Sequence, residues 1–490
     1  MRHILLYTFI LFGLSAIAQS RLDWLLNDID QNEPSFRINL RYHSAIQPRI
    51  ITNTIVGDTL KYLEEIKITQ QKKPGSIKVF PLVDLGVRGQ NNLEYRAMAG
   101  VQMEGNFGRK VYTRFSYLHG IENGTGFFRE KTSIGKTIKN NLNQKIDLRG
   151  RLSYSPNQFI NLQGGWDNQF IGEGSRSLFL SDYGKPLGFA MARSNFWRVE
   201  YLMLYQFLSE NNVLNQRVNK YATSHYLSFN ANSWLQIGVF ESVVFSPKDT
   251  LLNRGFEPEY LNPMIFFRPQ EYQLGSSDNS LIGVDAKIKI QSFTLYGQLM
   301  LDEFNLADIK GRTRWWANKY AVQMGIKTFK YYRNNKFFLR GEMNIVRPYT
   351  YSHLSVAQSY TNQGTPLAHP YGANFSELLI EVKWKNKKWE GELFVSYSLK
   401  GYDSDSLNYG GNIFIPYINR PINDFGHKIG QGKGNNALRS MVRVSYNLIP
   451  EIHLQAFLEG HFRYNTYLIE PQYQVIIGIR SRLWNDYRNY

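Results

Sequence analysis

His453-Leu-Gln-Ala-Phe-Leu-Glu-Gly-His-Phe-Arg-Tyr464 has apolar or small residues at its even positions and mostly polar residues at its odd positions. Successive side chains of a β-strand point to opposite faces, so this stretch predicts a strand with one apolar face and one polar face. We expect the apolar face to meet lipid and the polar face to line an interior. The two sets are Leu454, Leu458 and Phe462 on the lipid side and Gln455, Glu459 and Arg463 on the inner side.

The same alternation recurs through most of the chain. It is clear in residues 282–290, 377–385 and 439–448, where mainly aliphatic residues alternate with charged or polar ones. Many such runs of about ten residues, separated by turns, are the signature of a transmembrane β-barrel with a polar lumen. A large soluble β-solenoid or sandwich also alternates and is the alternative. The predicted fold class is therefore all-β, a transmembrane antiparallel β-barrel.

Residues 1–18 have the features of a signal peptide. Arg2 and His3 precede the apolar run 4–18, and Ser15-Ala-Ile-Ala18 offers small residues for cleavage before Gln19. The run is too short to span a bilayer as a helix. The chain contains no cysteine, so we expect neither a lipidated cysteine nor disulfides. Because no later apolar run has the length of a membrane helix, we expect the mature chain to leave the inner membrane.

Composition and the carboxyl terminus both favour the outer membrane. A mean hydropathy of −0.38 argues against a helical membrane protein, and 15% aromatic residues suit the aromatic girdles of a barrel. In residues 472–482, every second residue from Tyr473 to Ile479 is apolar or aromatic, and the chain ends at Tyr490. Such an ending resembles the assembly signal of bacterial outer-membrane barrels. The sequence therefore predicts the outer membrane of a Gram-negative cell.

Chain length limits the size of the barrel. We assign residues 1–18 to the signal peptide, 19–90 to a short N-terminal periplasmic segment with the first strands, and 91–490 to the barrel. At roughly 45–50 residues per hairpin, the barrel would have about 16–18 strands and a lumen that is open or plugged. Gly, Pro, Asn and Asp residues mark the expected outer loops, which are 120–139, 172–193, 247–278, 302–314, 350–374 and 403–436.

The net charge of +17 is spread over the polar faces of the strands and is mixed with carboxylates. One interpretation is solvated lumen walls and loops that face lipopolysaccharide. Another is a bias toward an anionic ligand such as an acidic polysaccharide. Nucleic acid is not expected as a partner in this compartment.

The most distinctive motif is residues 164–182, where a strand leads into a glycine-rich segment. Asp167, Arg176 and Asp182 offer hydrogen bonds that suit sugar hydroxyls. The stretch resembles the central motif of the Wzi family of capsule-assembly proteins, with Ile171 in place of an aromatic residue. The matching positions are Gly165-Trp-Asp167, Ile171-Gly-Glu-Gly174 and Ser177-Leu-Phe-Leu-Ser181.

Three shorter stretches extend the resemblance to residues 80–490. They are 260–263, 278–285 and 478–484, and the last looks like the version found in gliding bacteria. The resemblance implies a barrel of about eighteen strands, occluded by inserted loops, that binds capsular or extracellular polysaccharide as a lectin and helps to assemble or retain it. It also implies a link to gliding motility or secretion, with lipopolysaccharide and motility or secretion proteins as further partners. We expect a monomer without enzymatic activity, metal or cofactor.

A second candidate contact lies in residues 262–278, with Arg268, Glu271 and Asp278. We expect Arg176 and Arg268 to anchor the ligand, because a guanidinium presents several donors in a fixed fork. The competing interpretation is that 164–182 is a structural loop and that Arg176 pairs with a carboxylate of the lumen.

Two different functions remain as alternatives. One is an outer-membrane diffusion channel or uptake porin. The other is a lipid hydrolase, because His353-Leu-Ser355 would place both side chains on one face of a strand. The asparagine-glycine that follows the serine in outer-membrane phospholipases is missing, and no Gly-x-Ser-x-Gly motif occurs. Residues 430–435 are rich in glycine but lack the spacing of a phosphate-binding loop.

Overall fold

The computed structural model describes residues 43–47, 75–89, 93–108, 110–123, 134–139, 142–211, 216–247, 260, 262, 278–303, 305–404, 407–468, 470–481 and 483. The predicted signal peptide, 1–18, and most of the segment 19–90 before residue 75 lie outside this part of the chain. No helix in the described ranges is long and apolar enough to cross a membrane.

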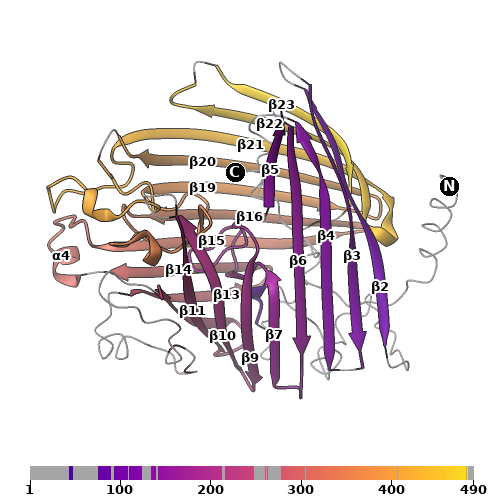
Figure 1. Cartoon of the computed structure of the whole chain (residues 1–490), viewed down its shortest axis with the longest axis horizontal. Helices are drawn as coiled ribbons and strands as arrows, with labels where there is room; N and C mark the ends of the chain where they lie inside the picture. Colours follow the sequence, from indigo (N-terminus) through magenta and orange to yellow (C-terminus); the bar gives the residue numbers. More distant parts are fainter. Residues whose placement is uncertain are drawn as a thin grey trace.

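Eighteen antiparallel strands form a closed barrel, which confirms the predicted fold class and strand number. Figure 1 shows β2 to β11 running steeply and β14 to β21 running nearly across them, as tilted strands do on opposite walls of a barrel. The strands of the barrel are β2 (Ser76–Gly89), β3 (Leu93–Phe107), β4 (Val111–Asn123), β6 (Leu142–Tyr154), β7 (Ile160–Asp167), β9 (Leu187–Phe196), β10 (Val199–Asn211), β11 (Arg217–Asn230), β12 (Leu235–Phe245), β13 (Asn279–Ile290), β14 (Phe293–Glu303), β15 (Lys319–Tyr332), β16 (Asn335–Val346), β19 (Phe375–Lys385), β20 (Trp389–Tyr402), β21 (Lys433–Ile449), β22 (Leu454–Asn465) and β23 (Gln472–Arg480).

The ring closes where β2 pairs with β23, from Asp84 opposite Arg480 to Gly89 opposite Val475. The barrel therefore begins at Ser76, and the expected boundary at residue 91 falls after its first strand. The remaining described elements are short: β1 (Ile46–Gln47), β5 (Ile134–Lys139), β8 (Phe170–Ile171), β17 (Thr361–Asn362), β18 (Thr365–Pro366), α4 (Leu306–Lys310), and the single 3₁₀ turns η5 (Val356–Gln358), η6 (Tyr417–Asn419) and η7 (Pro450–Ile452).

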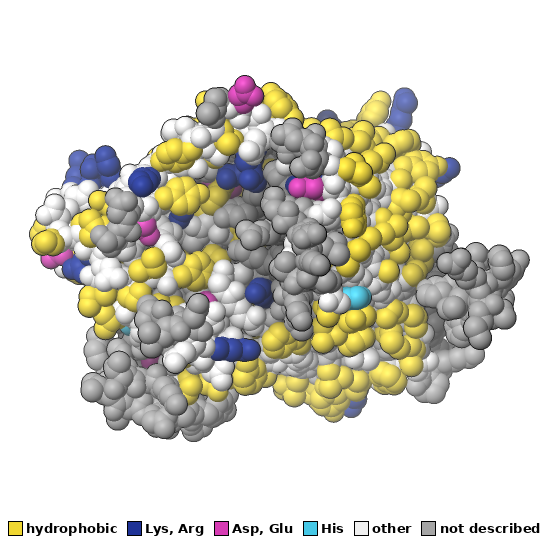
Figure 2. Space-filling view, turned by 45° about the horizontal axis from the view of Figure 1, so that its top comes forward, with side chains coloured by type: hydrophobic (Ala, Val, Ile, Leu, Met, Phe, Trp, Pro, Cys, Tyr) yellow, Lys and Arg dark blue, Asp and Glu magenta, His cyan; other side chains and the backbone are white. Residues whose placement is uncertain are grey.

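Strand β22 has the register that its sequence predicts. Leu458 is 53% exposed on the outside, whereas the neighbouring Glu459 is fully buried inside. The same division holds in β13, where Val284 is exposed and Asp285 is buried. The outward side chains form a broad apolar surface over the barrel wall, visible on the right of Figure 2. This surface suits the hydrocarbon core of a bilayer.

Short turns and long connections lie at opposite ends of the barrel. Turns such as 197–198, 291–292 and 333–334 join strands at one end, and segments such as 347–374 and 403–432 join them at the other. Outer-membrane barrels place short turns in the periplasm and long loops outside. Exposed aromatic residues gather near the short turns, as expected for a girdle: Phe107, Phe159, Phe196, Trp197, Trp234, Phe293, Tyr332, Phe337 and Trp389.

Three segments fold into the lumen, and we call them together the plug: residues 43–47, 168–186 and 347–374. Strand β1 pairs with β8 inside the barrel, and the His43 ring lies 2.7 Å from the hydroxyl of Ser228 on the wall. Residues 43–47, which belong to the predicted N-terminal segment 19–90, thus lie inside the barrel.

The plug and the wall share an apolar core. Phe179 is fully buried, and its ring stacks on that of Phe240 from the wall at 4.8 Å. Ile171, Leu178 and Leu180 are buried in the same cluster. The predicted outer loops 172–193 and 350–374 connect strands at the end with the long connections and fold inward for most of their length, while residues 187–193 belong to β9. These segments carry enough apolar side chains to be more stable inside the barrel than in water.

Candidate functional site

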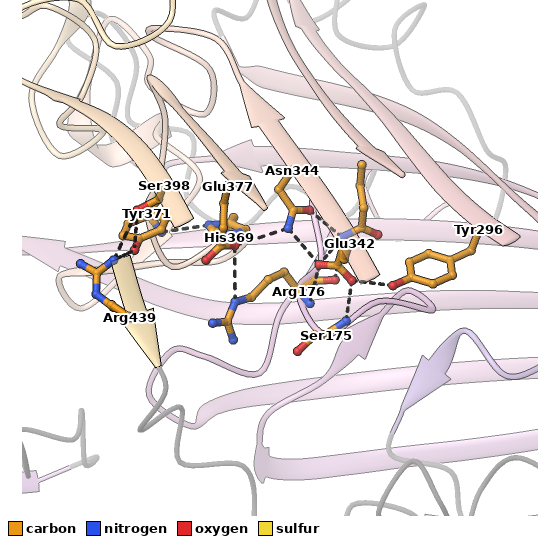
Figure 3. Close-up of polar contacts among 11 residues, drawn as sticks. Ser175, Arg176, Tyr296, Glu342, Asn344, His369, Tyr371, Glu377, Ser398 and Arg439 are labelled. Atoms are coloured by element: carbon orange, nitrogen blue, oxygen red, sulfur yellow. Dashed lines mark hydrogen bonds and ion pairs between the residues drawn. The ribbon is translucent and has the colours of Figure 1, made fainter. Parts of the chain in front are cut away.

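Arg176, the predicted ligand anchor, lies inside the barrel and is 1% exposed. Its Nε is 3.8 Å from a carboxylate oxygen of Glu377 on β19, and its guanidinium lies 5.4 Å from the centre of the Phe394 ring. The same oxygen of Glu377 lies 2.9 Å from Nε2 of His369 (Figure 3). Arg176 thus pairs with a lumen carboxylate, as the competing interpretation states. Its contact with a ligand stays a prediction.

Glu342 on β16 fixes the backbone on both sides of this arginine. Its carboxylate accepts hydrogen bonds from the amides of Ser175 and Arg176, at 2.8 and 3.2 Å, and from the Tyr296 hydroxyl at 2.7 Å (Figure 3). A methyl group at Gly174 would lie 2.4 Å from the same carboxylate. The glycine of the motif is therefore needed so that the plug can approach the wall this closely.

Glu173, the residue between the two glycines, was not selected from the sequence. Its carboxylate oxygens lie 2.9 Å from Nζ of Lys287 and 2.8 Å from Nζ of Lys327, both on the wall. Burial alone would raise the pKa of Glu173, but these two ammonium groups hold that pKa well below its usual range. A buried carboxylate with two lysine partners is a structural anchor, since losing either partner would leave an uncompensated charge.

Asp167, at the end of β7, is fully buried among three arginines of the wall. Its carboxylate lies 2.7 Å from Arg114, 3.2 Å from Arg151 and 3.7 Å from Arg149. Gly165, two residues before it, has a φ of +153° and leaves no room for a side chain, because a methyl group there would lie 2.1 Å from the carbonyl oxygen of Gly150. The Gly-x-Asp part of the motif therefore joins β7 to its neighbours.

Of the other predicted site residues, two are buried and two lie outside the described residues. Asp182 is buried in the plug, and its carbonyl oxygen accepts a hydrogen bond from Asn168 at 2.7 Å. Asp278 is also buried and accepts a hydrogen bond from the Tyr260 hydroxyl at 2.7 Å. Arg268 and Glu271 lie outside the described residues. The structure thus brings Asp167, Arg176 and Asp182 into the barrel interior without placing any of them on an exposed surface.

Lysines of the wall also hold the segment 347–374 and, at Gly411, the connection 403–432, and no sequence motif singled them out. Nζ of Lys220 donates to the carbonyl oxygen of Ser359 at 2.7 Å. Nζ of Lys400 donates to that of Tyr371 at 2.8 Å and to that of Gly411 at 2.7 Å. Each ammonium group thereby satisfies carbonyl groups that would otherwise be buried without partners.

The proposed hydrolase pair does not have the expected geometry. His353 and Ser355 lie in the plug and not on a strand. Nδ1 of His353 lies 3.0 Å from the side-chain oxygen of Gln358, and the Ser355 hydroxyl accepts from the amide of Ala357. Among the described residues, no group of three or more His, Asp or Glu side chains could hold a metal ion. The absence of enzymatic activity stays a prediction.

Aromatic and cationic side chains meet on the external side, in a surface that we call the outer platform: residues 305–316 and 417–428. The two segments are joined by the hydrogen bond from the Trp316 amide to the carbonyl of Asp424 at 2.8 Å. The Trp316 and Tyr417 rings lie 4.9 Å apart, and the Arg420 guanidinium lies 3.9 Å from the Trp316 ring. Both segments fall largely in predicted outer loops, but no sequence motif singled out these residues.

No family model matches the chain, and no curated protein matches it. Among solved structures, it is similar to Wzi of Escherichia coli, described as an outer-membrane protein involved in group 1 capsule assembly and as a carbohydrate-binding β-barrel. The TM-score is 0.60 at 12% identity, over 96% of this chain and 99% of Wzi. Pseudomonas aeruginosa OprD gives a TM-score of 0.43 at 8% identity, over 83% of this chain and 94% of OprD. Acinetobacter baumannii OccAB4 gives 0.45 at 10% identity, over 84% and 98%. The chain is therefore a large β-barrel of the outer-membrane type, similar in fold to Wzi.

Proposed function

We propose that this protein binds a surface polysaccharide, capsular or extracellular, on the outer face of the outer membrane and helps to assemble or retain it. The observation that carries this proposal is the plug packed inside the lumen, together with a cationic and aromatic surface on the external loops. A barrel whose interior is occupied by its own packed segments offers ligands its outer loops and not a passage.

The plug is built like a protein core and not like a mobile lid. Leu178, Phe179 and Leu180 are buried against the wall, and Glu173 pairs with two wall lysines. Removing these groups together would expose apolar area and leave buried charges unpaired, and both changes are costly. This favours a binding protein over the diffusion channel that the sequence also allowed.

The external loops have the chemistry that suits polysaccharides. Sugars offer hydroxyl groups and, in acidic polysaccharides, carboxylates, which pair well with arginine forks. The outer platform carries Lys310, Arg312, Arg314, Arg420 and Lys428 against only two acidic residues, Asp308 and Asp424. Wzi, to which the fold is similar, is described as carbohydrate-binding, and this supports the same class of ligand here.

The remaining parts of the proposal rest on the sequence motifs. The protein would act as a monomer and without catalysis, in contact with lipopolysaccharide. Proteins of a motility or secretion system would be its further partners. A cross-linking experiment in intact cells would identify them, and recovery of the barrel alone would count against such partners.

A direct test is polysaccharide binding by the purified full-length barrel on a glycan array and to polysaccharide extracted from its own cells. We expect saturable binding to at least one acidic polysaccharide. No binding to any of them would contradict the proposal. A lipase assay of the same sample addresses the hydrolase alternative, since activity that disappears in Ser355→Ala would favour hydrolysis.

A further inference from the structure

Two exposed arginines in the outer platform have an unusual backbone conformation. Arg312 and Arg314 have φ values of +53° and +57°, in the left-handed region that non-glycine residues seldom adopt because it is sterically unfavourable. Thr313 lies between them, so the strained positions alternate. Strain of this kind persists only where surrounding contacts impose it.

Hydrogen bonds on both sides impose the conformation. The Thr313 hydroxyl donates to the carboxylate of Asp308 at 3.0 Å, and the Thr313 amide donates to the backbone carbonyl of Asp308 at 3.2 Å. From the other segment, the amides of Gly426 and His427 donate to the carbonyls of Thr313 and Arg314, at 3.1 and 3.0 Å. The backbone is thus held firmly while both arginine side chains extend to solvent.

Neither guanidinium has a role in holding this fold together. Among the described residues, Arg312 and Arg314 have no ion pair or side-chain hydrogen bond. The two nearby carboxylates are engaged elsewhere, Asp308 with Thr313 and Asp424 with Arg420 at 3.0 Å. The outer platform therefore carries five cationic side chains against two carboxylates, a net charge of +3, which attracts an anion.

Buried groups beneath the surface support the same picture. Arg347 donates to the carbonyl of Trp315 at 3.0 Å and so adds a third cation behind the pair. Burial chiefly, and the charge of Arg314 in smaller part, lower the pKa of Arg347. Beside the arginines, Trp315 is half-buried and Phe425 is exposed. Figure 2 shows basic and hydrophobic side chains together at the left, the end where Figure 1 draws α4.

We propose that Arg312 and Arg314 form a binding site for the carboxylates of an acidic polysaccharide, a polyuronate, whose sugar faces lie against Trp315 and Phe425. This inference rests on the proposed function and names its site and its ligand class. A guanidinium binds a carboxylate through two parallel hydrogen bonds, and a fixed backbone avoids part of the ordering cost of binding. The strained backbone thus fixes the positions of two guanidinium groups, which can bind successive carboxylates along one polysaccharide chain.

The test uses the full-length barrel in detergent with alginate as the polyuronate probe and dextran as a neutral polysaccharide. The variant is Arg312→Gln with Arg314→Gln. The matched control is Arg333→Gln, an exposed arginine with a φ of +54° in a short turn at the opposite end of the barrel. Heat-modifiable mobility on gels reports whether each barrel is folded.

We expect alginate to bind in preference to dextran, the double variant to bind alginate about tenfold or more weakly, and Arg333→Gln to bind as the original protein does. Arg314→Lys should bind alginate more tightly than the double variant and more weakly than the original protein, because lysine keeps the charge and loses the guanidinium fork. Equal binding by a folded double variant would overturn the site and leave the proposed function standing. Equal binding of dextran and alginate would overturn the ligand class. No binding of any polysaccharide would contradict the proposed function itself.

Discussion

At the residue scale, the alternation along β22 gives the sharpest prediction. Leu458 faces outward, so Leu458→Lys should cost roughly 2–4 kcal/mol if it lies near the bilayer midplane. Leu458→Ala should cost much less, because a methyl group is still compatible with lipid. Denaturant unfolding in lipid vesicles, followed by gel mobility, measures both. A lysine tolerated as well as alanine would contradict the register.

The neighbouring Glu459 shows what the strand pattern could not reveal. From the sequence alone, Glu459→Gln is expected to be nearly silent for folding. In the structure, its two carboxylate oxygens each lie 2.5 Å from a nitrogen of Arg443 or His461. We now expect a loss of about 1–3 kcal/mol, because the change removes charge from a buried, hydrogen-bonded group. An unfolding midpoint equal to that of the original protein would contradict this revised value.

Glycines of the barrel differ in whether they can be replaced by alanine, which gives a third prediction at the residue scale. Gly165→Ala should destabilise the barrel or block its assembly, because the new methyl group would lie 2.1 Å from a carbonyl oxygen. Gly460→Ala, in β22, is the control, since nothing lies within 4 Å of its added methyl group. Assembly yield in cells distinguishes them. Equal yields would show that the wall around Gly165 adapts.

At the element scale, the plug segment 347–374 should respond to pH. Burial, with a smaller contribution from Lys319, lowers the pKa of His353 to about 4, and burial also lowers the pKa of His369. An opened segment would therefore bind protons more strongly than the packed one. The stabilisation is present above about pH 6.5 and is lost as the pH falls toward 4, by up to about 3 kcal/mol from His353.

Hydrogen exchange of this segment at pH 7.5 and pH 5 measures the effect. We expect smaller protection factors at pH 5, after correction for the slower intrinsic exchange at low pH, and a smaller difference between the two pH values in His353→Gln. The strand β9, which contains no histidine or carboxylate, is the internal control. Protection factors in 347–374 that do not depend on pH would show that these histidines do not control its packing.

Strands could be predicted from the sequence pattern itself, whereas inserted loops were expected only from the family resemblance and their contacts could not be predicted, for a physical reason. Every second side chain of a strand points to the same face, so the alternation in 282–290 and 377–385 shows directly which side chains face lipid. The segment 164–182 shows only that glycines and polar groups are present. Its partners Glu342 and Glu377 are more than 160 residues away in the chain, and no local pattern shows that they meet it inside the barrel.

The candidate site, too, could be predicted only in part. Asp167, Arg176 and Asp182 were selected because their side chains suit sugars, yet all three are buried inside the barrel. The strained Arg312 and Arg314 were missed, because a positive φ in a non-glycine residue leaves no mark in the sequence. Side-chain chemistry alone therefore could not separate the residues that hold the plug from those that face the exterior.

At the scale of the whole molecule, the protein is a closed barrel, and we propose that it binds polysaccharide on its outer face. Similarity in fold to Wzi is consistent with this, but the packed lumen is what separates a binding barrel from a channel. The wall and the plug share one apolar cluster, whose buried members run in the sequence from Ala45 to Ile413. We therefore expect them to unfold together in a single transition.

The most direct test is ion conductance and polysaccharide binding measured on the same purified sample. The barrel would be inserted into a planar lipid bilayer for conductance, and a second portion would be titrated with acidic polysaccharide. We predict saturable binding and no steady conductance. Steady, open-pore current from a sample that binds no polysaccharide would contradict the account and favour a diffusion channel.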